Sequence, residues 1–143
     1  MKKLLLLVFL TANVFLSQAQ NFFYVETGTG AENMIKEKLT RSSQFVTASL
    51  IESEYIIKPE INQQAKNNMQ TIRITVVDTM TLKTIYQSEE GYSASFINLS
   101  PKILSKFAIQ TFIEKNIPGI ILFTRHDSFH KMIRCTGLKK DKT

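Results

Sequence analysis

The chain has 143 residues, of which 43% are hydrophobic and 21% charged, with five glycines, three prolines and one cysteine. This composition is that of a folded domain, and it excludes collagen-like, intrinsically disordered and disulfide-framework proteins. The formal net charge of +6 lies in the leader and in the stretch from Arg125 onward, and residues 20–124 are neutral. That stretch therefore lacks the basic surface expected of a nucleic-acid-binding protein.

The first nineteen residues have the three regions of a secretory signal peptide. Lys2-Lys3 precedes an apolar run over Leu4–Leu16, and Ser17-Gln18-Ala19 places small residues at the two positions that a signal peptidase reads. A membrane-spanning helix needs roughly 20 apolar residues, and this run is shorter. We expect cleavage after Ala19 and a periplasmic or secreted product. Gln20 follows the cleavage point, where a lipoprotein would carry cysteine.

The next segments predict a strand, a turn and a helix. Phe22–Val25 is aromatic and β-branched, which favours a strand. Gly28-Thr29-Gly30 reads as a turn, and apolar residues at helical spacing predict a helix over 31–40. Thr29 and Glu32 have the spacing of a capping box.

Four strands and a long polar loop are expected in the middle of the chain. Residues 45–50 and 55–61 read as strands, and Pro59 favours a sheet edge or a bulge because it lacks an N–H group. Asn62–Gln70 is polar and predicts a long hairpin loop. Thr71–Val77 alternates apolar and polar residues, as a strand with one covered and one wet face does. Residues 78–81 predict a turn, followed by a strand over 82–87, and residues 91–96 either extend that strand or add another.

A second helix is expected to start with Ser100 as N-cap and Pro101 at its first position. The helix is expected to stop before Pro118-Gly119, with a last strand over 120–124. The predicted buried stripe of this helix consists of Ile103, Leu104, Phe107, Ala108, Thr111 and Phe112. Residues 125–137 fit no single prediction. The whole order predicts one α+β domain over residues 20–137, a mainly antiparallel sheet with two helices packed on one face. Residues 138–143 form a basic tail.

The sequence contains no complete cofactor motif. Gly28-Thr29-Gly30 lies between a strand and a helix, but the third glycine of the dinucleotide fingerprint is replaced by Asn33. No Gly-Lys-Ser/Thr follows, so the phosphate-loop pattern also fails. Glu52 with Glu54 and Glu89 with Glu90 are carboxylate pairs, and nothing places them at a cleft. We predict no cofactor and no catalytic residue.

One segment gathers the two histidines and the cysteine. On a strand His126 and His130 would lie roughly 13 Å apart, whereas on a helix they would be neighbours. Cys135 falls on another face in either structure, and we expect it to be buried. We predict no metal ligands, and we keep as an alternative a small metal-dependent hydrolase built on His126 and His130.

Two segments of the chain resemble the hairpin of a group of bacterial envelope proteins. They are Ser53-Glu54-Tyr55-Ile56-Ile57-Lys58-Pro59-Glu60-Ile61 and the run Thr71–Tyr86. The group includes the amino-terminal domain of TolB, the curli-secretion protein CsgG and the lipoprotein activators of penicillin-binding proteins. Pro59 and Leu82 stand where the group has glycine, and the lipobox cysteine is missing. The resemblance implies a small α+β domain that binds proteins in the periplasm or at the outer membrane and carries no catalytic residues.

We therefore expect an exported, non-enzymatic envelope protein that acts as a protein-interaction or assembly module. The expected contact surface is the sheet edge near Pro59 together with the polar loop, whose candidate residues are Asn62, Gln63, Gln64, Lys66, Asn67 and Asn68. A further alternative is a glycan- or lipid-binding module that uses the basic end of the chain. In that case an anionic surface would be contacted by Lys139, Lys140 and Lys142.

Overall fold

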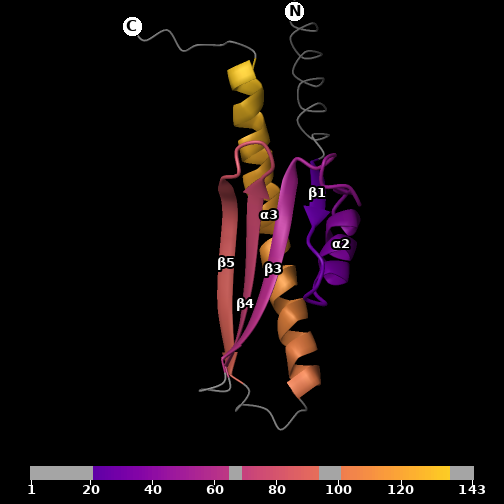
Figure 1. Ribbon diagram of the computed structural model, residues 1–143, viewed down its shortest axis with the longest axis vertical. Helices are drawn as coiled ribbons and strands as arrows, with labels where there is room; N and C mark the ends of the chain where they lie inside the picture. The colour runs from indigo at the N-terminus through magenta and orange to yellow at the C-terminus, as the bar shows by residue number, and fades with distance from the viewer. Residues whose placement is uncertain (1–20, 65–68, 94–100, 136–143) are drawn as a thin grey trace, which may run out of the picture.

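The computed structural model describes residues 21–64, 69–93 and 101–135. Five strands form one sheet in the order β2-β1-β3-β4-β5. Helices α2 and α3 pack on one face of this sheet, with α3 running along its length (Figure 1). The opposite face carries no helix within the described part of the chain. This is the predicted α+β architecture.

The amino-terminal part forms β1 (Phe22–Val25), α2 (Glu32–Arg41) and β2 (Phe45–Val46). β1 pairs in parallel with both β2 and β3, so the sheet is antiparallel only on its other side. The strand predicted over 45–50 is therefore only two residues long. Gly28 and Gly30 have φ values of +115° and +78°, left-handed conformations that favour glycine in a turn.

The capping box at the start of α2 does not form as predicted. Ala31 is the N-cap residue, and no side chain caps the helix. Thr29 Oγ1 instead accepts a hydrogen bond from the Ala31 N–H at 3.3 Å and donates one to the Glu32 carboxylate at 3.5 Å. Thr29 thus lies two residues ahead of the capping position and orders the turn rather than the helix.

The long strands are β3 (Tyr55–Gln64), β4 (Met69–Asp78) and β5 (Thr84–Ser93), paired antiparallel. The predicted loop over Asn62–Gln70 is mostly wrong, because Asn62, Gln63 and Gln64 continue β3 and pair with the start of β4. Ladder hydrogen bonds come from the backbone, so a polar run can extend a strand. β5 is one continuous strand, so the described residues from Gly91 extend the strand predicted over 82–87, which is one of the two expected alternatives. Only residues 55–57 of β3 pair with β1, so Pro59 lies where β3 has a strand on one side, as predicted.

Helix α3 (Pro101–Cys135) continues through Pro118 and Gly119. The predicted stop at 118, and the strand predicted over 120–124, are both wrong. A proline inside a helix costs about 3 kcal/mol, and burial of a continuous apolar stripe on either side of it offsets that cost. The stripe consists of Ala108, Ile109, Phe112, Ile113, Ile117 and Ile120. Phe107 and Thr111, expected in the stripe, are exposed instead, and the side chains of Ile103 and Leu104 lie outside the described part of the structure.

Gly119 allows α3 to approach β5 closely. A Cβ atom at Gly119 would lie 3.1 Å from both Cε2 and the hydroxyl oxygen of Tyr86. The Tyr86 hydroxyl donates a hydrogen bond of 2.6 Å to Asn116 Oδ1, which holds the ring in the space that the glycine leaves. Absence of a side chain at 119 is therefore a packing requirement of the α3–β5 contact.

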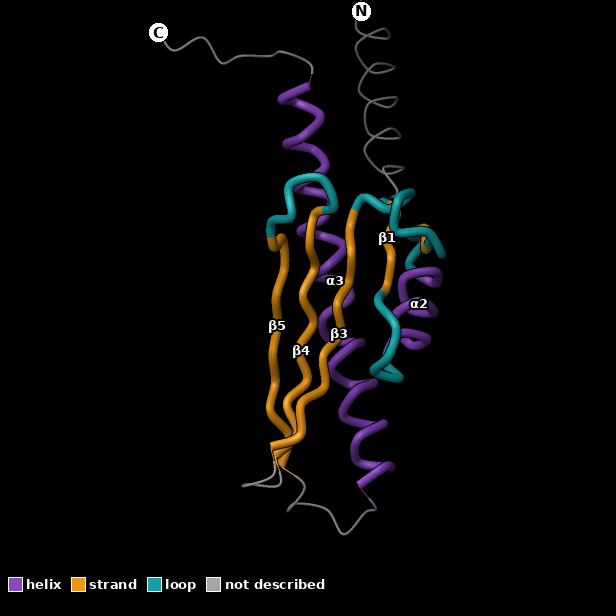
Figure 2. Tube along the Cα trace, in the orientation of Figure 1, coloured by secondary structure: helices purple, strands orange, loops and turns teal. Residues whose placement is uncertain are grey.

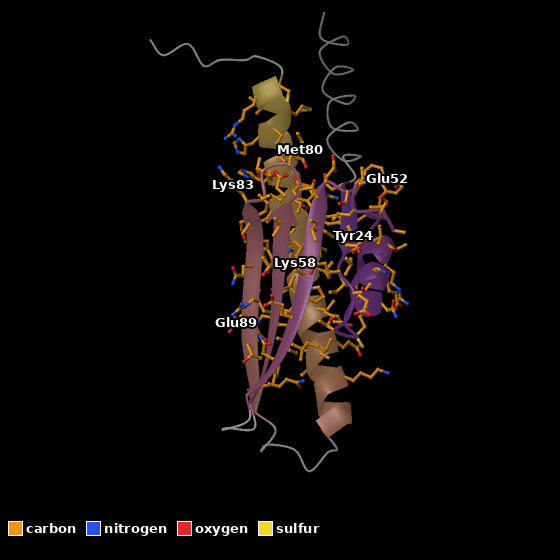
Figure 3. The ribbon with its side chains drawn as sticks, in the orientation of Figure 1. Tyr24, Glu52, Lys58, Met80, Lys83 and Glu89 are labelled. Atoms are coloured by element: carbon orange, nitrogen blue, oxygen red, sulfur yellow. The ribbon has the colours of Figure 1, made fainter. Side chains whose placement is uncertain are left out.

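The core lies between the sheet and the two helices. It includes Phe23 and Tyr55 on the sheet, Ile35 and Leu39 on α2, and Phe112 on α3. On β4 the predicted alternation is confirmed, since Ile72, Ile74 and Val76 are buried. The open face is charged at its centre, where Arg73 forms ion pairs with Glu60 on β3 and Glu89 on β5. Lys58 and Glu89 mark this face in Figure 3.

Candidate functional site

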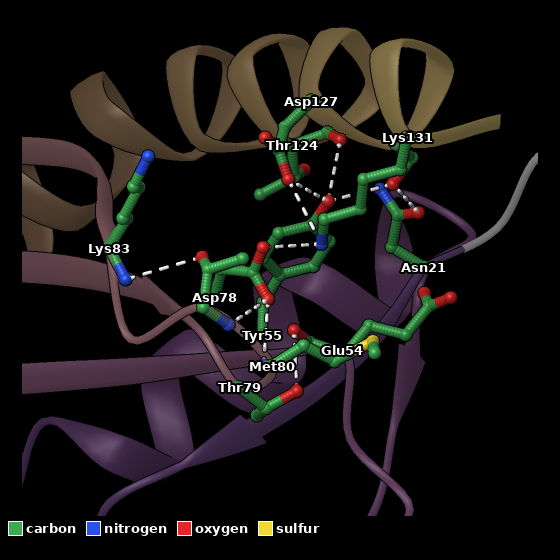
Figure 4. Close-up of polar contacts among 12 residues, drawn as sticks. Asn21, Glu54, Tyr55, Asp78, Thr79, Met80, Lys83, Thr124, Asp127 and Lys131 are labelled. Atoms are coloured by element: carbon green, nitrogen blue, oxygen red, sulfur yellow. Dashed lines mark hydrogen bonds and ion pairs between the residues drawn. The ribbon is translucent and has the colours of Figure 1, made fainter. Parts of the chain in front are cut away.

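A group of polar side chains between sheet and helix lies where α3 passes the start of β3 and the end of β4 (Figure 4). Tyr55, the first residue of β3, is fully buried, and its hydroxyl reaches α3. It donates to the Thr124 carbonyl oxygen at 3.1 Å or to Asp127 Oδ2 at 2.8 Å, and it lies 2.8 Å from Ser128 Oγ. Ser128 Oγ in turn donates to Asn21 Oδ1 at 2.9 Å.

Lys131 connects α3 to the end of β4. Its Nζ lies 2.6 Å from Asp78 Oδ2 and 3.1 Å from Asp127 Oδ2. It also lies 4.8 Å from the centre of the Tyr55 ring, within cation–π range. Asp78 is only 1% exposed, and register places it directly opposite Tyr55. We call Asn21, Tyr55, Asp78, Asp127, Ser128 and Lys131 the polar cluster.

The charge states of the polar cluster follow from its geometry. Burial raises the pKa of Tyr55 to about 12, so this phenol stays protonated at neutral pH. Burial acts to raise the pKa of Asp78, but the Lys131 ammonium and the Met80 N–H outweigh it and hold that pKa below its usual value. Burial likewise opposes the charge of Lys131, and its carboxylate partners nevertheless raise its pKa. A neutral phenol, a carboxylate and an ammonium thus fasten α3 to the sheet.

Asp78 also orders the turn that follows β4. Its Oδ1 accepts hydrogen bonds from Met80 N at 2.8 Å and Thr81 N at 3.4 Å. Thr79 joins this turn to the loop before β3, because its Oγ1 donates to the Ser53 carbonyl oxygen at 2.8 Å or to that of Glu54 at 3.0 Å. The two connections therefore form one unit at this end of the sheet, beyond which the last turns of α3 extend (Figure 2).

This unit presents large apolar side chains to solvent. Ile51 is 95% exposed, Met80 86% and Leu82 74%, and Leu50 is also exposed. We call Leu50, Ile51, Met80 and Leu82 the apolar end; Figure 3 labels Met80 beside Lys83 and across from Glu52. Leu82 has φ +57°, a left-handed conformation that strains a side chain other than glycine, asparagine or aspartate. This is a position at which the resembling group has glycine.

The histidine segment is helical. His126 and His130 are exposed on α3, and their Nε2 atoms lie 3.2 Å apart. Cys135 is exposed and forms no disulfide, so the prediction of a buried thiol is wrong. The reason is that α3 extends beyond the end of the sheet that would cover this residue (Figure 1). Within the described residues no three His, Cys, Asp or Glu side chains converge on a metal position.

Each carboxylate of the two candidate catalytic pairs is bound by a neighbouring residue through a hydrogen bond or an ion pair. Glu54 accepts from the Phe22 N–H at 3.2 Å, and Glu52 from Thr47 Oγ1 at 3.1 Å. Glu89 and Glu90 are consecutive on β5, so they point to opposite faces of the sheet. There Glu89 pairs with Arg73 and Glu90 with Lys115. These carboxylates do not flank a common cleft.

The predicted contact residues are only partly within the described structure. Asn62 is exposed on β3, and Gln63 and Gln64 complete that strand. Lys66, Asn67 and Asn68 lie outside the described residues, as do Lys139, Lys140 and Lys142. No helix in the described part of the chain has the length and apolar character needed to cross a membrane.

The polar cluster was missed by the sequence reasoning, although one signal was available. Asp78 follows Ile72, Ile74 and Val76 at the same spacing of two residues, so its carboxylate lies on the covered face of β4. A charge in that position requires a buried partner. The partner, Lys131, lies in the segment that the sequence left without a structure.

No family model and no curated protein matches the chain. Among solved structures it is similar to the C-terminal domain of LpoB from Salmonella enterica, with 9% identity, a TM-score of 0.42, and 52% of this chain and 84% of that chain covered. For the lipoprotein GNA1162 from Neisseria meningitidis the identity is 6% and the TM-score 0.45, with 68% of this chain and 97% of that chain covered. For a minor lipoprotein from Acinetobacter baumannii the identity is 14% and the TM-score 0.43, with 70% of this chain and 91% of that chain covered. These values establish no family, and the resemblance to TolB and CsgG stays a prediction.

Proposed function

We propose that this chain is an exported, non-enzymatic protein of the bacterial envelope that acts by binding another protein through its apolar end. The observation that carries the proposal is the exposure of Ile51, Met80 and Leu82 on two connections that hydrogen bonds tie together. Large apolar side chains exposed on two connected loops favour a covering partner, because burying each removes it from water. This surface replaces the predicted polar loop as our leading candidate.

A protein suits the apolar end better than an anionic membrane does. Lys131, the α3 cation joined to this end, is already paired with Asp78 and Asp127. Glu52 and Glu54 lie on the same loop as Ile51, and an anionic lipid surface would repel them. Met80 has a flexible thioether side chain, which adapts well to a protein surface.

The polar cluster supports a non-enzymatic role. An acid–base catalyst works best when its pKa lies near the working pH, and the Tyr55 pKa is displaced away from neutrality. Asp78 and Lys131 are held in their charged forms by each other. The cluster thus supplies rigidity to the end of the molecule that carries the apolar surface.

The test is photo-crosslinking in living cells. A photoreactive amino acid replaces Ile51 or Met80 in the full-length chain, and Phe107, an equally apolar and 67% exposed residue near the start of α3, serves as the matched control. Asn62 reports on the polar surface predicted from the sequence. We expect positions 51 and 80 to give the same envelope-protein adduct and position 107 to give none. Adducts with lipid alone, equal adducts from position 107, or a protein adduct from position 62 only would overturn the proposal.

A second measurement uses the purified partner identified in this way. The double variant Ile51→Ser/Met80→Ser should bind it at least about tenfold more weakly, because two apolar contacts worth about 1 kcal/mol or more each are lost. Phe107→Ser should bind as the unchanged chain does. Both variants alter exposed side chains, so each should unfold within about two degrees of the unchanged protein.

A further inference from the structure

The two histidines of the chain bring two imidazole nitrogen atoms within hydrogen-bond distance of each other on an exposed part of α3. His126 and His130 are one helical turn apart on α3, and their Nε2 atoms lie 3.2 Å from each other. The ring centroids are 4.4 Å apart, at an angle of 71° between the ring planes. Both side chains are exposed, so an ion can reach them directly.

This separation fits two ligands of one metal ion. An imidazole nitrogen binds Zn²⁺ at about 2.0–2.1 Å, so two such nitrogens at the tetrahedral angle lie about 3.3–3.4 Å apart. Without metal, one ring donates a hydrogen bond to the other. With metal, both rings carry their proton on Nδ1 and present the Nε2 lone pair to the ion.

The rest of the structure holds this turn of α3 in place. Asp127 lies between the two histidines in sequence and points to the sheet, where it accepts from Tyr55 at 2.8 Å and pairs with Lys131. Lys131 is itself tied to Asp78. Ligands on a rigid element lose little conformational freedom on binding, which favours chelation. Asp127 is committed to these partners and does not supply a third ligand.

We propose that His126 and His130 form a surface chelate for a divalent transition-metal ion of the Zn²⁺ or Ni²⁺ class, with solvent filling the remaining positions. Imidazole prefers such ions over Mg²⁺ and Ca²⁺, which take oxygen ligands. This site is separate from the apolar end and stands whether or not that surface binds a protein. It is a binding site, and no reaction is assigned to it.

The test is isothermal titration of the purified chain, prepared without a polyhistidine tag, with Zn²⁺, Ni²⁺ or Mg²⁺. All variants carry Cys135→Ser, so the exposed thiol does not contribute. We expect one Zn²⁺ or Ni²⁺ per chain, no heat from Mg²⁺, and affinity about tenfold or more lower in His126→Ala and in His130→Ala. Thermal unfolding without metal checks that each variant is folded.

A matched control keeps two histidines but breaks their geometry. Combining Arg125→His with His126→Ala moves one imidazole to a position five residues from His130, about 140° away around the helix. This variant should bind Zn²⁺ and Ni²⁺ as weakly as the single alanine variants do. Binding equal to that of the parent, or no binding of either ion by the parent, would overturn the proposal.

Discussion

The Nζ atom of Lys131 lies 2.6 Å from Oδ2 of Asp78 and joins α3 to the last residue of β4. The carboxylate is 1% exposed and the lysine side chain 32% exposed. The pair lies at the end of the core, where α3 passes the sheet and continues beyond it (Figure 1). It therefore determines how firmly the histidine-bearing turn of α3 is attached to the rest of the molecule.

Replacing Asp78 by Asn should lower the free energy of unfolding by about 2 kcal/mol. The substitution keeps an oxygen for the Met80 N–H but removes the charge that faces Lys131, and hydrogen bonds to charged groups contribute about 1.5–3 kcal/mol. Urea unfolding at neutral pH measures the change. The matched control is Glu37→Gln, which alters the exposed pair with Arg41 and should cost less than about 0.5 kcal/mol. Equal losses in the two variants would contradict a special role for Asp78.

Tyr55 should make stability depend on pH in the alkaline range. Its pKa is about 12 in the folded chain and about 10 when unfolded, so the folded chain retains the proton over this interval. Stability from this group is complete below pH 10 and falls as pH rises toward 12.

The variant Tyr55→Phe should show a shallower decline of unfolding free energy between pH 10 and 12. Some decline should remain, because burial also raises the pKa of Tyr86 and Tyr92. At neutral pH the variant should be less stable by about 1–2 kcal/mol, since Asp127 and Ser128 lose a partner. An unchanged alkaline slope in Tyr55→Phe would disprove this assignment.

Gly119→Ala should destabilise the protein although alanine favours helix. The new methyl group would lie 3.1 Å from Cε2 and from the hydroxyl oxygen of Tyr86, a side chain that its hydrogen bond to Asn116 holds in place. Overpacking of this kind costs about 1–3 kcal/mol. In a Tyr86→Ala background the same substitution should instead stabilise by up to about 1 kcal/mol, the helix-propensity gain. The unchanged chain, the two single variants and the double variant form a double-mutant cycle, which thermal unfolding measures. A change in stability of the same sign for Gly119→Ala in both backgrounds would refute the explanation by overpacking.

Leu82→Gly should raise the free energy of unfolding by about 1 kcal/mol. Leu82 has φ +57°, where a side chain costs about 1–2 kcal/mol relative to glycine, and the side chain is 74% exposed, so little packing is lost. Leu82→Asn tests the same strain with a residue that tolerates this conformation. If the apolar end binds a partner, Leu82→Gly should weaken that binding while stabilising the chain. Loss of stability in both variants would show that Leu82 is not strained.

Local pattern was a reliable guide wherever one strand or helix face is covered and the other is wet. The alternation in Thr71–Val77 predicted the buried face of β4, and the aromatic run in Phe22–Val25 predicted β1. The fold class followed from the order of these elements. The pattern failed at Asn62–Gln70 and at Pro118-Gly119, where polar residues extend strands and a proline lies inside a helix.

The sequence by itself determined the sheet with helices on one face, because alternation and helical spacing are local properties of consecutive residues. Tertiary structure alone decided the length of α3, since burial of Ile117 and Ile120 against the sheet outweighs the local cost of Pro118. It also decided that Tyr55, Asp78 and Lys131 meet, because such contacts depend on strand register and on the path of a helix far along the chain. The convergence of His126 and His130 depended on the same helix: their spacing was visible from the start, but only a continuous α3 brings the two nitrogens together.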